Sequence, residues 1–136
     1  MSEKTVEIHN TNQPFIYVSD WYNYRVVRFR DMSGTDWQEI GPLEGWGVID
    51  GPTCIRIDPE GKFLIVDRGR STLLRLDKFS NDSSFETFQN HALYRPQRVA
   101  FDSHGRIYIT GGDADNIIRI DNLSGTNLIE LPLKGH

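Results

Sequence analysis

The chain has 136 residues, 38% of them hydrophobic and 11% aromatic, and carries a formal net charge of −4. The aromatic content predicts a packed core rather than disorder, and the weak acidity argues against a nucleic-acid partner and against a basic membrane-binding surface. The single cysteine, Cys54, excludes an intrachain disulfide, and the lack of a signal-peptide core or of an apolar run near the roughly 18 residues of a membrane span predicts a cytoplasmic protein.

The first third of the chain predicts short strands at Val6–Ile8, Ile16–Asp20 and Val26–Phe29. The middle third predicts four of them, and Pro and Gly in the segment Asp58–Gly61 are typical of a hairpin turn between the first two. One of the four is a continuous apolar run rather than an alternating one, which predicts that both of its faces are buried. The four predicted strands are Thr53–Ile57, Phe63–Val66, Leu73–Leu76 and Phe85–Phe88.

The last third of the chain repeats the middle third. Pro52–Asp58 reappears 44 residues later as Pro96–Asp102, and Arg75 meets Arg119 at the same offset. An upstream copy lies at an offset of 47, where the alignment places Val6–Ile8 opposite Thr53–Ile55. The sequence therefore predicts a single domain of three repeated units.

The three units cover residues 5–50, 51–94 and 95–133, about 45 residues each. Each is predicted to be a four-stranded antiparallel meander, and no segment has the periodicity of a long helix. A repeated meander with buried middle strands is typical of a β-propeller blade. A sandwich or a barrel would have one core without repetition, so we predict an all-β chain of three propeller blades.

The motifs of these units resemble the NHL repeat. Ile16–Asp20 followed by Asn23–Phe29 is similar to its second half, and Pro96–Asp102 followed by Gly105–Ile109 is similar to its first half. The sequence departs from the pattern in the third unit, where Gly111 replaces the aspartate. The dipeptide Asp20-Trp21 and the Ser-Gly-Thr turns at 33–35 and 124–126 also resemble the LDL-receptor-type YWTD propellers. Both resemblances imply a six-bladed propeller that binds a partner more often than it catalyses a reaction.

Three blades form only half of such a ring, because closed propellers have about 4–8 blades. An open arc would expose a flat apolar face at each end. We expect two copies to close a six-bladed homodimer, and the alternative is a fragment of a longer array. The predicted contact joins two sets of apolar residues, one from the first blade and one from the third. They are Val6, Ile8, Val18 and Val27 on the first blade and Val99, Ile109, Ile118 and Ile120 on the third.

One loop departs most from the repeat average and is the predicted binding site. Trp21, Tyr22 and Tyr24 crowd a turn in the first unit, and the same turn of the second unit carries Arg68 and Arg70. Exposed Trp and Tyr are frequent binding anchors, and loops carry recognition. The two arginines add a basic contact for an acidic partner. The alternative is that the aromatic rings only cover a neighbouring blade.

Other residues recur at fixed positions in the units, which favours a structural role. Asp20 and Asp67 end equivalent strands, where carboxylates bind backbone amides of tight turns. The alternative is a carboxylate ring around Ca²⁺, although Gly111 interrupts it. The second recurring set consists of arginines predicted to bind carbonyl or carboxylate oxygens of the next blade, with a ligand channel as the alternative. They are Arg28, Arg75 and Arg119.

These observations favour a non-catalytic scaffold without a cofactor, which binds a protein or a small ligand. The second hypothesis is a hydrolase or lyase of the metal-dependent propeller type, with Asp20, Asp67 or His104 as candidate ligands of a central cation. The third is a structural unit of a longer array. No set of catalytic residues can be chosen from spacing alone.

Overall fold

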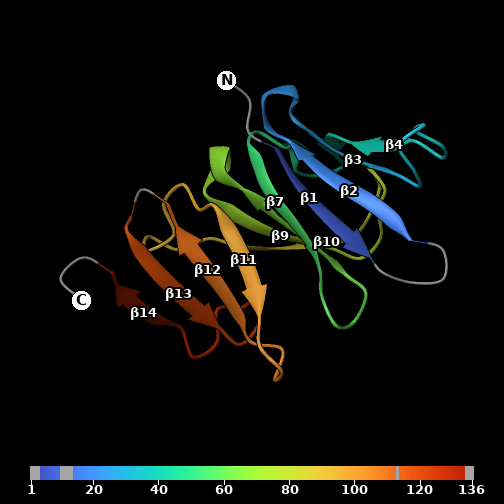
Figure 1. The fold of residues 1–136 in the computed structure, drawn as a ribbon. Helices are drawn as coiled ribbons and strands as arrows, with labels where there is room; N and C mark the ends of the chain where they lie inside the picture. The colour runs from blue at the N-terminus through green and yellow to red at the C-terminus, as the bar shows by residue number, and fades with distance from the viewer. Residues whose placement is uncertain (1–3, 10–13, 113, 134–136) are drawn as a thin grey trace.

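A computed structural model describes residues 4–9, 14–112 and 114–133, and shows an all-β chain. Three four-stranded antiparallel sheets follow one another along the chain, and a two-stranded hairpin lies between the first and the second (Figure 1). The regular secondary structure of the described residues consists of strands and two short 3-10 turns. The prediction of an all-β chain is confirmed.

The first sheet consists of β1 (Lys4–His9), β2 (Phe15–Asp20), β3 (Arg25–Phe29) and β4 (Gln38–Ile40), paired in that order. The turn between β2 and β3 is the 3-10 turn η1 (Trp21–Asn23), which ends at Tyr24 in the left-handed region, with φ 55°. The hairpin β5 (Pro42–Leu43) and β6 (Gly47–Val48) then leads to the second sheet.

The second sheet consists of β7 (Pro52–Ile57), β8 (Phe63–Asp67), β9 (Thr72–Leu76) and β10 (Phe85–Phe88), with the 3-10 turn η2 (Arg68–Arg70) between β8 and β9. The third consists of β11 (Arg98–Phe101), β12 (Ile107–Gly111), β13 (Asn116–Ile120) and β14 (Ile129–Pro132). The first strands of the sheets, β1, β7 and β11, contact one another in sequence, so the sheets stack with their first strands on one side (Figure 1).

The second sheet is buried on both faces, as its apolar runs predict. Ile65 and Leu74 face the first sheet in a cluster with Tyr17 and Val26. On its other side a second cluster joins this sheet to the third, and it includes Cys54. Leu64, Ile65 and Val66 have 0% exposure, because alternate side chains of β8 enter different clusters.

The structure corrects the sequence alignment in the first strand. Val6 pairs with Val18, whereas the residue that pairs with the equivalent Ile65 is Ile55. Val6 therefore corresponds to Ile55 and not to Thr53. Val6 and Val18 are 12 positions apart in the sequence, whereas Ile55 and Ile65 are 10 apart, and these two additional residues in the first hairpin shift the alignment.

The structure also corrects the prediction of which side of the third sheet is uncovered. The residues expected to meet a partner, Val99, Ile109, Ile118 and Ile120, are buried against the second sheet. Period-two alternation identifies the faces of a strand but does not say which neighbour covers each one. The uncovered side is formed by the other set of alternating residues.

Within the described residues, no helix has the length and apolar character that a membrane span requires.

Candidate functional site

The predicted aromatic turn and one of the predicted arginines form a single cluster between the first and second sheets. The rings of Trp21 and Tyr22 are stacked, with centroids 5.2 Å apart and an interplanar angle of 4°. The guanidinium of Arg68 lies 5.0 Å from the Trp21 ring centroid, a cation–π distance. Gly51 leaves room for the indole of Trp21, because a Cβ at this position would lie 2.8 Å from Nε1 of Trp21.

The members of this cluster differ in exposure. Tyr22 and Tyr24 are each 51% exposed, and Trp21 is half-buried. Arg68 is buried, so it does not present its charge to a partner as the sequence predicts. The reason is that the indole of Trp21, from the neighbouring sheet, lies against its guanidinium.

Arg70, the last residue of η2, contacts a different residue, Trp46, which lies in the connection between the first and second sheets. Its guanidinium stacks on Trp46 at 4.4 Å, and Nη1 donates a hydrogen bond to the backbone oxygen of Trp46 at 2.8 Å. The surface that the turns offer therefore consists of Tyr22, Tyr24 and the edge of Trp21, with Arg70 beside Trp46.

Asp20 is held by side-chain donors. Its carboxylate accepts hydrogen bonds from Lys4 at 2.6 Å, from Asn23 at 2.9 Å and from Nε of Arg25 at 2.9 Å. Burial acts to raise the pKa of Asp20, but these hydrogen bonds together outweigh it and lower the pKa from 3.8 to about 2. These interactions tie the start of β1 to the turn between β2 and β3.

We expect Asp20→Asn to lower the free energy of unfolding by about 2 kcal/mol at pH 7. Because the folded-state pKa lies below the unfolded value, this contribution is complete above about pH 5 and is lost as the pH falls through about 2. Urea unfolding at pH 7 and pH 3 measures the change, and the difference from wild type should shrink at pH 3. Glu44→Gln, at an exposed carboxylate, is the control; an Asp20→Asn difference that is equal at both pH values contradicts the prediction.

Asp67 occupies the equivalent position with different partners. It is fully buried and accepts the backbone N–H groups of Gly51 at 2.8 Å and Asp50 at 3.1 Å. Burial raises the pKa of Asp67, and these amide hydrogen bonds oppose the rise. The carboxylate thereby anchors the connection that enters the second sheet.

The third sheet has no aspartate at this position. The side chain of Asn116, from the facing strand, occupies the space where a Cβ on Gly111 would lie. Across the described part of the chain, no three His, Cys, Asp or Glu side chains are grouped as metal ligands would be.

The three repeated arginines have different surroundings. Arg75 binds carboxylates of its own sheet, with Nε 2.7 Å from Asp58 and further contacts to Glu60 and Glu86. Arg28 instead lies over Phe79 of the next sheet, 4.8 Å from the ring centroid. The Nε of Arg119 is buried and has no hydrogen-bond partner among the described residues.

The first and third sheets each have one face that no other described sheet covers. On the first, Val6 is 63% exposed and Ile8 is 55% exposed, whereas Val27, also expected to meet a partner, is 3% exposed in the single chain. We call this side the leading face, and it is formed by Val6, Ile8, Ile16, Val18, Val27 and Phe29. On the third, Ile129 is 51% exposed and Leu131 is 46% exposed. We call this side the trailing face, and it is formed by Tyr108, Thr110, Ile117, Arg119, Ile129 and Leu131.

Both faces repeat the composition of faces that are buried inside the chain. The strand registers place the leading face in the same position as the side of the second sheet that packs on the first, formed by Ile55, Ile57, Phe63, Ile65, Leu74 and Leu76. They place the trailing face in the same position as the side of the first sheet that packs on the second, formed by Tyr17, Ser19, Val26, Arg28, Gln38 and Ile40. The two uncovered faces therefore have the residue types of the two sides of one internal contact.

The sequence analysis did not identify the trailing face. The alternation of Ile129 and Leu131 with polar residues was a usable signal, because period-two alternation marks one apolar side of a strand. Tyr108 and Arg119 were a second signal, since the same residue types stand at the positions of Tyr17 and Arg28.

Comparison with solved structures shows a propeller fold. A catalytically inactive virginiamycin B lyase from Staphylococcus aureus, solved with quinupristin, matches with a TM-score of 0.69 and 15% identity over 96% of this chain and 42% of that one. A streptogramin B lyase matches with a TM-score of 0.65 and 16% identity, over 97% of this chain and 46% of that one. A protein from Lactobacillus plantarum matches with a TM-score of 0.65 and 14% identity, over 93% of this chain and 40% of that one.

The chain thus spans less than half the length of the propeller proteins that it matches. No protein-family model matches the sequence, and no curated protein matches it.

Proposed function

We propose that this chain is an NHL-type half-propeller that closes a six-bladed ring with a second copy of itself and serves as a non-catalytic binding scaffold. In this assembly the leading face of each copy packs on the trailing face of the other. The two contacts are related by a two-fold axis, so the ring closes without leaving an uncovered face.

The match between the two uncovered faces is the observation that carries this proposal. Tyr17 on one side of the internal contact packs against Phe63 on the other, with ring centroids 5.6 Å apart. Across two copies, the same pair of positions is Tyr108 and Ile16. The solved propellers, which are more than twice as long as the part matched here, support a ring larger than three sheets.

The binding surface in this proposal is the aromatic turn. Tyr22 and Tyr24 are exposed, while the stack of Trp21 on Arg68 holds the turn against the second sheet. Rigid aromatic side chains lose little conformational entropy on binding, which suits them to recognition. A closed two-copy ring presents this surface twice.

Light scattering across a concentration series tests the assembly. We expect a molar mass of twice 15.6 kDa at micromolar concentration and a fall toward 15.6 kDa on dilution. A mass of 15.6 kDa throughout would contradict the closed ring, and masses that rise without limit would show that the contact forms open chains. The second result would point to a partner of different geometry, such as further blades of a longer polypeptide.

A further inference from the structure

The loops between the third and fourth strands of the three sheets carry one equivalent apolar side chain. Each loop is closed by a backbone hydrogen bond, from Arg30 to Thr35 in the first sheet, and from Asp77 and Asp121 in the others. The residue two positions after the donor is Met32 in the first sheet, Phe79 in the second and Leu123 in the third. Met32 is 87% exposed, whereas Phe79 is 4% exposed and Leu123 is 6% exposed.

The difference in exposure follows from what precedes each sheet. Phe79 inserts against the first sheet, where its ring centroid lies 5.5 Å from that of Tyr17 and 4.8 Å from the guanidinium of Arg28. Gln38 adds a hydrogen bond to the backbone oxygen of Phe79 at 3.1 Å. Leu123 likewise joins the apolar cluster between the second and third sheets. Met32 lies on the first sheet, which no described sheet precedes.

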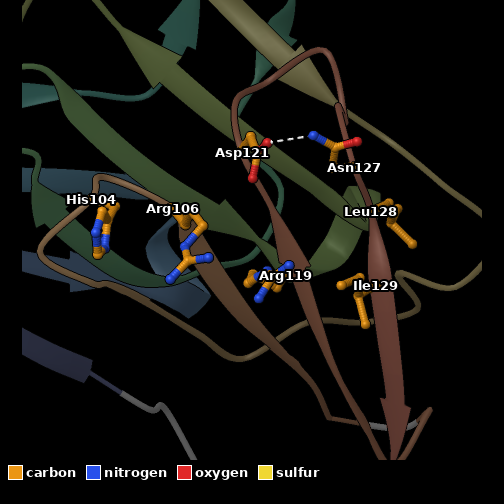
Figure 2. A pocket seen from close by; sticks show the side chains of 7 residues that line it. All are labelled: His104, Arg106, Arg119, Asp121, Asn127, Leu128 and Ile129. Atoms are coloured by element: carbon orange, nitrogen blue, oxygen red, sulfur yellow. Dashed lines mark hydrogen bonds between the residues drawn. The ribbon is translucent and has the colours of Figure 1, made fainter.

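The trailing face has residues at the positions that contact such an inserted side chain elsewhere in the chain. The positions that hold Phe79 in the first sheet correspond to Tyr108, Arg119 and Ile129 in the third. A broad open hollow of about 750 Å³ lies there, and Figure 2 shows Arg119 and Ile129 among the side chains around it. Its lining residues are His104, Arg106, Arg119, Asp121, Asn127, Leu128 and Ile129.

A glycine in the same loops gives an independent sign of this contact. A Cβ on Gly125 would lie 2.8 Å from the ring of Phe88 in the second sheet, so this turn packs directly on the sheet before it. Gly34 stands at the same place in the first sheet and has nothing within 4 Å of such a Cβ. The residue equivalent to Phe88 in the third sheet is Leu131, on the trailing face.

We infer that Met32 of one copy inserts into the hollow beside Arg119 and Ile129 of a second copy, while Gly34 packs on its Leu131. This inference rests on the proposed two-copy ring. The flexible thioether of methionine suits an irregular hollow that has polar and apolar walls. Met32 thereby takes the same place between two sheets as Phe79 and Leu123 take within the chain.

Cross-linking between two variants, each with one introduced cysteine besides Cys54, tests the contact. Met32→Cys and Ile129→Cys are prepared separately and mixed, with a short bis-maleimide as the cross-linker. We expect a covalent dimer from the mixture and none from either variant alone, because the contact is head to tail. Cys54 is buried and burial raises its thiol pKa, so it stays unreactive. The control pairs Met32→Cys with Lys78→Cys, on the exposed loop of the second sheet.

A further variant tests the Met32 contact independently of whether the two-copy ring forms. Met32→Lys places a positive charge in a hollow lined by Arg106 and Arg119, and we expect dimer dissociation at a concentration at least about tenfold higher than for wild type. If the doubled mass persists unchanged in Met32→Lys and the Met32–Ile129 pair fails to cross-link, the ring stands and the Met32 contact is wrong. If wild type is monomeric at every concentration, the ring is wrong as well.

Discussion

Replacing Val6 with glutamate should convert the protein from twice 15.6 kDa to 15.6 kDa at micromolar concentration. Val6 is 63% exposed in the single chain, so the substitution leaves the internal packing of the three sheets intact. Its equivalent Ile55 is 1% exposed against the first sheet, and Val99 is 3% exposed against the second. Closing the ring would bury the new carboxylate in the same apolar surroundings, which costs several kcal/mol unless the charge is neutralised.

The penalty applies twice in a two-fold ring, because each copy contributes one leading face. Leu131→Glu tests the opposite side of the same contact, since Leu131 is 46% exposed and its equivalents Ile40 and Phe88 are buried. Val48→Glu is the matched control, as Val48 is 50% exposed but lies on the small hairpin and on neither face. Light scattering and circular dichroism report mass and folding. A doubled mass in both Val6→Glu and Leu131→Glu would overturn the face-to-face assembly.

Replacing Ile65 with alanine should lower the free energy of unfolding by about 2–5 kcal/mol. Ile65 has 0% exposure and lies in the cluster that joins the first and second sheets, where it is the partner of Ile55 and Leu74 across the strands. The loss combines the transfer of the removed methyl and methylene groups with the cavity left behind. For a small domain this is a large part of the total stability.

The equivalent position in the first sheet provides the comparison. Val18 lies on the leading face and is only partly buried in the single chain. Val18→Ala should therefore cost less than Ile65→Ala at high dilution, and its cost should rise at concentrations where the ring is closed. Chemical denaturation at two protein concentrations measures both. A cost below about 1 kcal/mol for Ile65→Ala would show that the internal contact is loosely packed and is a poor template for the ring.

The aromatic turn shows which features of the site follow from the local sequence and which depend on tertiary contacts. The sequence alone indicates that Trp21, Tyr22 and Tyr24 interrupt the repeat and lie in a turn. It does not indicate that Arg68 lies under Trp21, because this contact joins residues 47 positions apart in different sheets. The same contact removes Arg68 from the surface, and so reduces the basic character predicted for this site.

The sequence by itself determined the repeat, the burial of the second sheet and most of the strands, because these follow from local apolar patterns and from turn residues such as Pro59 and Gly61. It did not predict the short hairpin of β5 and β6. Only the tertiary structure decided which side of the third sheet is covered and which residue of β1 corresponds to Ile55. Side chains alternate between two apolar faces in every strand, so the pattern is the same whichever neighbour covers each face. The order in which the sheets stack assigns the faces, and it leaves Val6 and Leu131 uncovered at the two ends of the chain's three sheets.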